Sequence, residues 1–467
     1  MRVSGAFLIA FSSALALPTS EKWIEKDVCI IGGGASGTYA AVRLKQQHVD
    51  VALIEKEGKL GGPVTTYTDS STGQTYDYGV QVFSNLSVVH SFFHHFDIPL
   101  VQLPPPSGGD TKMMNFETGE VVPPAQLYLG NLTEAMLGYA EQQAKYSSIF
   151  EDWDLPDPVP EDLLLPFGDF LKKHNLEAFA YIAFLYDQGI ANLLAQPTLY
   201  VMKYQDRVQI QDLLTGGFVV NGLQNNQLLY DRAAAAIDDG RSLYLNSYPT
   251  EITRHSDRVE ITVVTKNGVK HIRARKLLVT IPPKSTVSFL DLDRSEQTMF
   301  RQFNNSYYWN AILKNTGIPV GTTLPNVNPE APLNIPAMPG MYTFLASPVP
   351  GLHATYYSSP HNMSDEEVSA DILSTLQRVR QGAGYPEPEH SPELVALHKW
   401  SQFEMTVSND AIRKGFYNDL LALQGKKNTW WTGATWMNQA TATLWRYTEE
   451  KVLPHLVPER DILRVQE

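Results

Sequence analysis

Three glycines near the start of the chain have the spacing of a phosphate-binding turn. Gly32, Gly34 and Gly37 follow the apolar run 28–31. In such a turn the first glycine permits a tight bend, the second lets the backbone approach a pyrophosphate, and the third lets the next helix pack closely. The segment 38–47, TYAAVRLKQQ, has helical periodicity and would direct its free N–H groups at the phosphates. We therefore predict a strand–turn–helix unit that binds a dinucleotide.

Two further features extend this unit. Glu55 ends a second apolar strand, 18 residues beyond Gly37, where a carboxylate is placed to bind ribose hydroxyls. Lys59 then precedes a second glycine turn, Gly61-Gly62. A simple NAD enzyme needs neither this second turn nor the later strand interrupted at Gly79, whereas a large two-domain flavoprotein does.

These motifs resemble the FAD-dependent amine oxidase superfamily. The matching positions are the three glycines of the first turn, Glu55, Lys59 with the second turn, the segment 77–80 (DYGV), and Gly433 within TGATW. The signal-like start and the TGATW ending look most like the secreted fungal flavoproteins of the β-cyclopiazonate dehydrogenase type. Pro63 and Ala434 depart from the pattern, because the family usually has an arginine and an acid there.

The resemblance implies FAD as the cofactor and a definite set of cofactor-binding positions. These are Gly32, Gly34, Ala35, Ser36, Gly37, Glu55, Lys56, Lys59, Gly61, Gly62, Tyr78, Gly79, Val80, Gln81, Gly433, Ala434 and Met437. In the family, a helix starts beneath the flavin after the last glycine, so we expect one beginning near Trp436. Its positive end would stabilise a reduced flavin by about 0.5–2 kcal/mol.

The expected fold class is α/β, with a Rossmann-like FAD-binding domain and an interleaved α+β substrate domain of mixed sheet and helices. The FAD-binding domain would comprise 21–103, 211–290 and 401–467, which includes a C-terminal helix. The substrate domain would comprise a mostly helical segment, 104–210, and a second part, 291–400. Local patterns predict a helix over about 176–195, a hairpin at Asn267-Gly268 and a capping box from Ser364 to Glu367.

The first 20 residues read as a secretory signal peptide, with Arg2 before an apolar run and small residues near the end. Four N-x-[ST] patterns also favour a secreted glycoprotein. The net charge of −13 argues against a nucleic-acid partner. No later apolar run predicts a transmembrane segment. The single cysteine, Cys29, lies in the first strand and reads as a small buried residue.

No metal site is predicted. His90 and His94 stand four residues apart, a spacing that two zinc ligands can have. Neither a third ligand nor the HExxH form is visible, so a helix surface is the preferred interpretation.

For function, we expect a secreted oxidoreductase that takes hydride from a C–N or C–H bond of a small apolar or aromatic metabolite or an amine. Electrons would pass to oxygen, and oxidative cyclisation is compatible with this chemistry. The candidate catalytic residues are Lys314, His398 and Trp436, with Trp400 as a further candidate and Met437 beside Trp436 on the substrate wall. Three alternatives stay open: a redox-neutral isomerase of unsaturated fatty acids, a thioether oxidase resembling prenylcysteine oxidase, and a flavoprotein kept only for binding.

Overall fold

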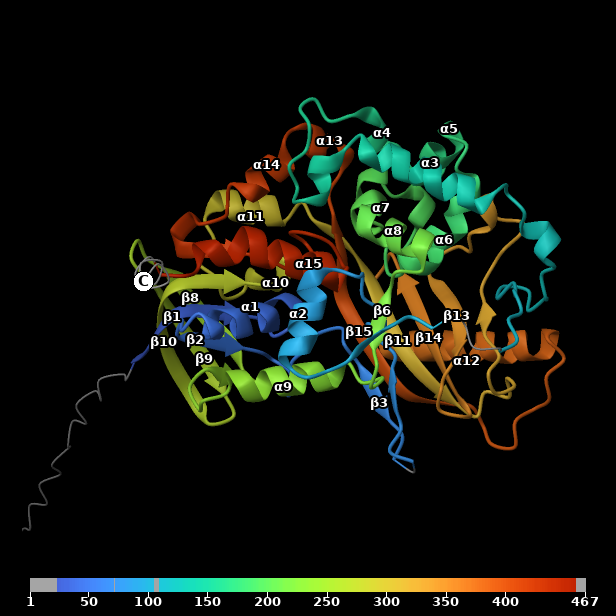
Figure 1. The fold of residues 1–467 in the computed structure, drawn as a ribbon, viewed down its shortest axis with the longest axis horizontal. Helices are drawn as coiled ribbons and strands as arrows, with labels where there is room; N and C mark the ends of the chain where they lie inside the picture. Colours follow the sequence, from blue (N-terminus) through green and yellow to red (C-terminus); the bar gives the residue numbers. More distant parts are fainter. Residues whose placement is uncertain (1–22, 71, 105–108, 459–467) are drawn as a thin grey trace, which may run out of the picture.

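The computed structural model describes residues 23–70, 72–104 and 109–458. The predicted signal peptide, 1–20, lies outside the described residues. Two large sheets stand side by side, and helices surround both (Figure 1). No helix of the described residues combines the length and the apolar character needed to cross a bilayer.

The first sheet, here called the dinucleotide sheet, has seven strands in the order β7-β2-β1-β10-β9-β8, with β16 beside the end of β10. The bounds are β1 (Trp23–Ile31), β2 (Val51–Ile54), β7 (Leu243–Tyr244), β8 (Tyr248–Arg254), β9 (Val259–Thr265), β10 (Gly268–Val279) and β16 (Thr429–Trp431). β7, β2, β1, β10 and β16 pair in parallel, whereas β8, β9 and β10 form an antiparallel meander. The parallel strands are buried because helices cover them.

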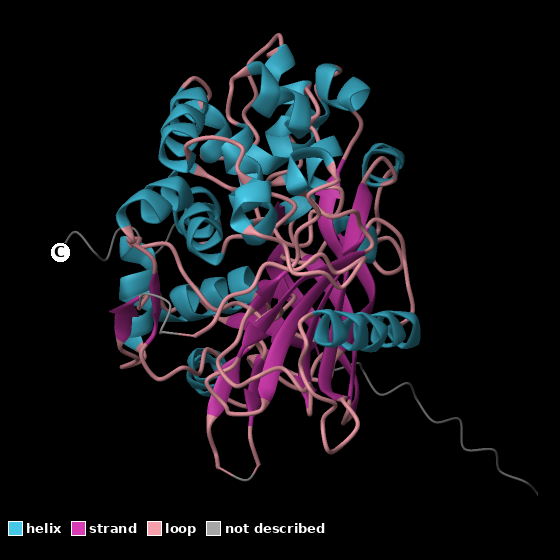
Figure 2. Cartoon of the chain, turned by 90° about the vertical axis from the view of Figure 1, so that its right-hand side faces the viewer, coloured by secondary structure: helices cyan, strands magenta, loops and turns pink. Residues whose placement is uncertain are grey.

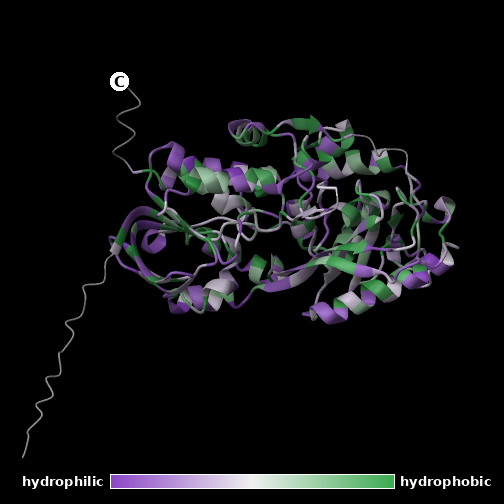
Figure 3. Cartoon of the chain, turned by 90° about the horizontal axis from the view of Figure 1, so that it is seen from below, coloured by the Kyte–Doolittle hydropathy of each residue, from purple (hydrophilic) through white to green (hydrophobic). Residues whose placement is uncertain are grey.

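The second sheet is antiparallel and has five strands in the order β12-β13-β14-β11-β15. The bounds are β11 (Asn304–Lys314), β12 (Leu324–Pro325), β13 (Gly340–Ala346), β14 (Leu352–Ser359) and β15 (Glu393–Thr406). Helix α12 (Asp365–Gly382) packs on one face, where Trp309 of β11 donates a hydrogen bond to Asp365 Oδ1 at 2.9 Å. In Figure 3 this peripheral helix alternates between hydrophilic and hydrophobic residues, as expected when one face is buried.

A third layer, the helical region, lies above the antiparallel sheet (Figures 1 and 2). It contains α3 (Leu132–Ala144), α4 (Glu161–Leu164), α5 (Phe167–Lys173), α6 (Ala180–Tyr186), α7 (Thr198–Tyr204) and α8 (Arg207–Thr215). The remaining helices are α1 (Ala35–Gln46), α2 (Ser87–His95), α9 (Gln227–Ile237), α10 (Pro283–Thr286), α11 (Arg294–Phe300), α13 (Asn409–Arg413), α14 (Phe416–Leu421) and α15 (Thr441–Tyr447). Two small antiparallel ribbons connect the layers. One pairs β3 (Thr66–Thr68) with β4 (Thr75–Asp77), and the other pairs β5 (Leu100–Gln102) with β6 (Val219–Asn221).

The α/β fold class and the interleaved sheet are confirmed. The hairpin at Asn267-Gly268 forms between β9 and β10, and Ser364 and Glu367 form the predicted capping box of α12. The continuous helix predicted over 176–195 is wrong. The chain breaks after α6, where Gly189 has φ +89° and lies so close to Phe403 that an added Cβ would be 2.3 Å from its ring. The domain boundaries stay predictions, although β15 runs past residue 400.

A buried ion pair joins the edge of the dinucleotide sheet to α11. Both terminal nitrogens of Arg254 donate to the carboxylate of Glu296, at 2.9 and 2.7 Å, and neither side chain is more than 1% exposed. We expect Arg254→Met to destabilise the protein by about 3–5 kcal/mol, because it leaves the Glu296 charge buried and unpaired. Urea denaturation measures this change.

The matched control is Arg413→Met, which removes the exposed ion pair with Glu161 and should leave the denaturation midpoint unchanged. Equal midpoints for the two variants would contradict this account of the buried pair.

Candidate functional site

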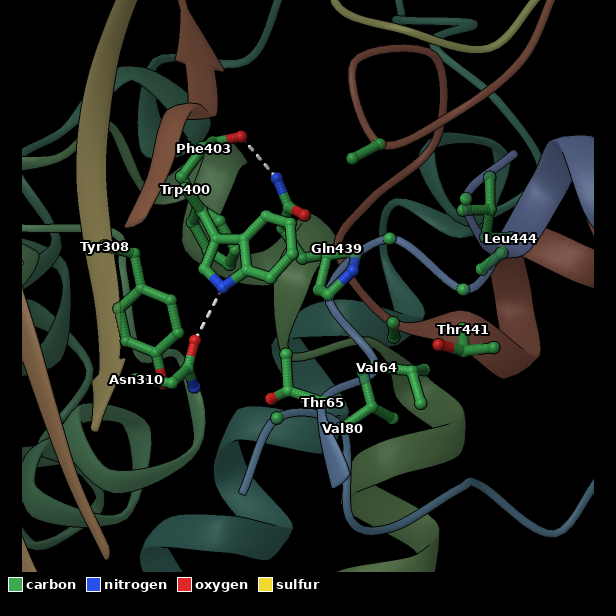
Figure 4. A pocket seen from close by; sticks show the side chains of 18 of the residues that line it. Val64, Thr65, Val80, Tyr308, Asn310, Trp400, Phe403, Gln439, Thr441 and Leu444 are labelled. Atoms are coloured by element: carbon green, nitrogen blue, oxygen red, sulfur yellow. Dashed lines mark hydrogen bonds between the residues drawn. The ribbon is translucent and has the colours of Figure 1, made fainter. Parts of the chain in front are cut away.

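A large cavity lies between the two sheets, below the helical region. Its volume is about 1330 Å³, above the usual 300–1,000 Å³ of a small-molecule site. One wall comes from loops at the carboxyl ends of the parallel strands and the other from the antiparallel sheet (Figure 4). The cavity therefore has room for a dinucleotide and a second molecule.

In the turn after β1, two backbone segments approach each other too closely for a side chain between them. Gly32 has φ +104°, and a Cβ on Gly37 would lie 1.9 Å from the carbonyl oxygen of Gly32. Gly34 differs, because the nearest protein atom to its added Cβ would be the Cα of Gly62 at 3.9 Å. Gly34 and Gly62 are therefore in van der Waals contact, and both line the cavity without a side chain. Helix α1 begins there with no side-chain cap. The first N–H groups of α1 beside this bare backbone suit a phosphate chain.

Glu55 supports this turn from the end of β2. Its Oε2 accepts a hydrogen bond from the backbone N–H of Gly33 at 2.6 Å, and its Oε1 accepts from that of Glu57 at 2.8 Å. A carboxylate has about four lone-pair positions, so acceptor capacity remains for a ribose. Lys56 and Lys59 follow on the exposed side of the same loop.

The loops around Gly62 and Gly79 pack against each other. A Cβ on Gly79 would lie 2.1 Å from the carbonyl oxygen of Pro63, so this contact tolerates no side chain. Asp77 anchors the second loop by accepting from the N–H of Asn226 with both oxygens, each at 3.0 Å. Burial raises the pKa of Asp77 to about 6.

The last glycine turn follows β16. Gly433 has φ +105°, and its added Cβ would lie 2.6 Å from the carbonyl oxygen of Thr280. The helix expected near Trp436 instead begins at Thr441, as α15. The difference has a physical cause: residues 434–436 form a turn and 437–440 continue without helix, and the side chain of Asn438 holds this segment by donating to the carbonyl of Lys203 at 2.8 Å.

Most predicted cofactor residues come together in the cavity wall. Those in the wall are Gly32, Gly34, Ala35, Ser36, Glu55, Lys56, Lys59, Gly61, Gly62, Gly79, Val80, Gln81, Gly433 and Ala434. Gly37 and Tyr78 lie behind the wall, and so does Met437, whose sulfur is 3.6 Å from Lys203 Nζ. Pro63 and Ala434, the two departures from the family pattern, also line the cavity without supplying a charge there.

The predicted catalytic residues are dispersed. Lys314 is exposed at the end of β11 and does not line the cavity. Trp436 is fully buried behind the wall, stacked on Trp431 with 5.5 Å between ring centroids. His398 does line the cavity, with its ring 4.3 Å from that of Trp400, and burial lowers its pKa. These three residues therefore do not form one catalytic group.

The wall opposite the glycine turns comes from alternate residues of β11 and from the segment 398–403 of β15. Trp400 Nε1 donates to Asn310 Oδ1 at 2.6 Å, and Asn310 Nδ2 donates to the carbonyl of Tyr78 at 3.1 Å (Figure 4). Tyr308 Oη donates to Gln188 Oε1 at 2.6 Å. Sequence reasoning missed Tyr308 and Asn310, although the alternation of a strand over 304–314 places them on one face.

Gln81 connects the two walls. Its amide nitrogen donates to the Tyr356 hydroxyl at 2.8 Å and to the carbonyl of Asp77 at 2.7 Å. Gln81 belongs to the predicted cofactor set, and Tyr356 belongs to the antiparallel sheet. A bound cofactor and a bound substrate would therefore meet close to this contact.

Comparison with known proteins gives consistent results. Residues 30–96 match the family model described as an NAD(P)-binding Rossmann-like domain. The FAD-dependent oxidoreductase pigF of Monascus ruber is 34% identical, over 93% of this chain and 92% of its own. Beta-cyclopiazonate dehydrogenase of Aspergillus flavus is 31% identical, over 96% of each chain.

Two solved structures show the same fold at low identity. A fatty acid isomerase from P. acnes that produces CLA superposes with a TM-score of 0.74 at 19% identity, over 92% of this chain and 99% of its own. Putrescine oxidase bound to putrescine gives a TM-score of 0.65 at 15% identity, over 96% and 100%.

The residues present fit the FAD that the relatives' names specify. Gly34 and Gly62 line the cavity with backbone alone, α1 begins uncapped beside them, and Glu55 stands at the ribose position. The cavity volume of about 1330 Å³ accommodates both FAD and a substrate.

This geometry predicts different outcomes for substitutions at two glycines of one motif. Gly34→Val adds a side chain to the cavity wall, and its Cβ would meet the Cα of Gly62 only at a van der Waals distance of 3.9 Å. The protein should therefore fold while its FAD content falls at least about tenfold. Gly37→Ala would collide with the carbonyl oxygen of Gly32 and should lower the melting temperature as well. Flavin absorbance and thermal denaturation measure the two effects. A Gly34→Val protein that keeps a full complement of FAD would refute the assignment.

Proposed function

Because the chain belongs to the FAD-dependent oxidoreductases related to beta-cyclopiazonate dehydrogenase, we propose that it oxidises an uncharged, largely apolar small molecule. The relatives cover nearly the whole chain, so FAD dependence and oxidoreductase activity apply to this protein. Bound FAD supplies a two-electron acceptor for a C–H or C–N bond of the substrate. The chain supplies binding, orientation and exclusion of water.

The observation that carries the proposal is that the substrate wall, within the described part of the chain, has no acidic residue and only one lysine, whose ammonium is already bonded to the protein. This wall comprises the cavity residues contributed by the helical region, the antiparallel sheet and the loops beside them. They are Leu103, Leu185, Tyr186, Gln188, Tyr204, Gln209, Phe218, Tyr308, Asn310, Thr323, Pro325, Thr343, Leu345, Tyr356, His398, Lys399, Trp400, Ser401, Gln402 and Phe403. A charged substrate group buried against this wall would have no partner and would cost several kcal/mol.

The other charged residues of the cavity are positioned elsewhere. Glu55, Lys56, Glu57 and Lys59 belong to the loop after β2, at the ribose position. Lys399 is in the wall, but its Nζ donates to Asn362 Oδ1 at 2.8 Å and to the carbonyl of Met363 at 2.6 Å. Lys399 therefore does not serve as a counter-ion for a substrate.

This wall argues against the fatty acid isomerase, because a fatty acid needs a cation for its carboxylate. It offers no carboxylate to an amine in its cationic form, so such a substrate would depend on the aromatic rings alone. Tyrosine hydroxyls and amides instead suit a flat molecule that carries neutral oxygen or nitrogen atoms. The thioether oxidase and the binding-only flavoprotein remain less specific alternatives, because no observation in this cavity favours either one.

A matched set of indole compounds tests the proposal. We expect tryptophol, which is neutral, to bind at least about tenfold more tightly than tryptamine or indole-3-acetate, because burying the charge of either of these two compounds is unfavourable. Binding is followed by the change in flavin absorbance. Anaerobic spectral titration measures the three dissociation constants. Tighter binding of tryptamine would instead support an amine substrate.

We further propose that oxygen accepts the electrons. A compound that bleaches the flavin anaerobically should restore its colour when air is admitted, with about one hydrogen peroxide per flavin. A flavin that stays reduced in air would contradict oxygen as the acceptor.

Secretion is proposed on two observations. The apolar segment 1–20 has the features of a signal peptide, and the asparagine of every N-x-[ST] pattern is exposed, at Asn85, Asn131, Asn304 and Asn362. We expect the protein from a eukaryotic host to lose its first 16 to 20 residues or so and to shift in mass after glycosidase treatment. N-terminal sequencing and mass spectrometry measure both. An intact Met1 on an unglycosylated protein would contradict secretion.

A further inference from the structure

A group of buried polar side chains in the helical region has atoms with no hydrogen-bond partner. We call it the lid cluster: Tyr139, Gln143, Asp187, Gln205 and Asp206, each 0% exposed. Its unpartnered atoms are Tyr139 Oη, Gln143 Oε1, both carboxylate oxygens of Asp187, Gln205 Oε1 and Nε2, and Asp206 Oδ2. Buried polar groups are ordinarily paired, so this concentration requires an explanation.

The cluster joins three segments of the helical region. Tyr139 and Gln143 lie on α3, Asp187 follows α6, and Gln205 and Asp206 lie between α7 and α8. Gln143 Nε2 donates to the backbone carbonyl of Gln205 at 2.6 Å. Tyr204 Oη donates to the carbonyl of Gln188 at 3.1 Å, so the segment after α6 lies against the segment between α7 and α8. In agreement with this arrangement, the charges of Asp187 and Asp206 raise the pKa of Tyr139, after the larger effect of burial.

Burial makes a negative charge costly on both carboxylates, and only Asp206 has partial compensation from backbone N–H groups. Asp187 is the C-cap of α6, where the backbone carbonyls already concentrate partial negative charge. Asp206 caps α8 with one oxygen, which accepts from the N–H groups of Val208 at 2.9 Å and Gln209 at 3.0 Å. Its other oxygen and both oxygens of Asp187 are directed at no donor of the described residues.

No side chain of the described residues hydrogen-bonds the free oxygens of the cluster. The charges of Arg446 and Lys203 both lower the pKa of Asp206, after the larger opposing effect of burial, but Lys203 Nζ donates to the carbonyls of Ile149 and Asp152. Burial and the charges of Glu404 and Asp206 raise the pKa of Asp187, so its carboxylate is held in the charged form only if a cation compensates it. The described residues contain no group of three His, Cys, Asp or Glu able to hold a metal, which excludes a zinc-type site among them.

We propose that the lid cluster binds one hard divalent cation, of the size of calcium, through side-chain oxygens. Two carboxylates balance the charge of one divalent ion. The carboxylate, amide and phenol oxygens are ligands that such an ion prefers, and calcium accepts six to eight oxygens in flexible geometry. The side-chain amide of Gln205 can be turned by 180°, which exchanges its oxygen and nitrogen, so its oxygen can face the cation.

The cation would fix the helical region over the cavity. The residues next to the cluster in sequence, Tyr186, Gln188 and Tyr204, line the substrate wall. Tyr204 Oη donates to the carbonyl of Gln188 at 3.1 Å, directly beside two of the proposed ligands. Binding at the cluster would therefore hold this part of the wall in place.

The test uses the full-length FAD-loaded protein and does not depend on its substrate. We expect elemental analysis of the purified protein to find about one calcium per chain. After exhaustive EDTA dialysis, added calcium should raise the melting temperature by several degrees, whereas potassium should not. A metal-free protein whose melting temperature is unchanged by calcium and magnesium would show that the cluster holds only water, and would overturn the proposal.

Two isosteric substitutions localise the effect. Asp187→Asn should abolish both the bound calcium and the calcium-dependent rise in melting temperature. Asp154→Asn removes the same charge from an exposed position and should change neither. Retention of calcium by Asp187→Asn, with an unchanged melting response, would overturn the site. Because metal content is measured directly, this outcome is distinct from any failure of the proposed oxidase activity.

Discussion

The architecture depends on how closely three backbone segments approach each other at the carboxyl ends of the parallel strands. Gly37 lies against the carbonyl of Gly32, Gly433 lies against the carbonyl of Thr280, and Thr280 Oγ1 donates to the carbonyl of Ile31 at 3.0 Å. No side chain fits at either glycine. The segments come from opposite ends of the sequence, so the cofactor site exists only when the first, middle and last parts of the chain have assembled.

The antiparallel sheet completes the site under a different constraint. Its strands need no glycine, because side chains and not backbone form its cavity face. Asn310 is bonded on both sides, to Trp400 and to the backbone of Tyr78, and so joins the substrate wall to the segment that carries Gly79. Tyr356 makes the equivalent connection through Gln81. Rigid placement of one wall relative to the other follows from these few hydrogen bonds.

Sequence reasoning succeeded where short-range backbone chemistry decides the structure. The turn at Gly32 and the capping box at Ser364 depend on residues a few positions apart, and Glu55 lies within the same strand–turn–helix–strand unit as Gly33. It failed where distant contacts decide. The break in the predicted helix over 176–195 follows from the contact between Gly189 and Phe403, and α15 starts at Thr441 because the segment before it is bound to the helical region. The substrate wall was likewise invisible, since β11 and β15 are distant in sequence and meet only in the folded sheet.

Strand β11 contributes to both the cavity and the separate hydrophobic core beneath α12. Tyr308 and Asn310 face the cavity, while Trp309 between them packs beneath α12. Exchange of a cavity-facing residue therefore leaves the core on the opposite face with its original neighbours. Substrate preference can diversify in this way by single substitutions, without loss of the stability that α12 provides. One cofactor framework could thus be reused for many different metabolites during evolution.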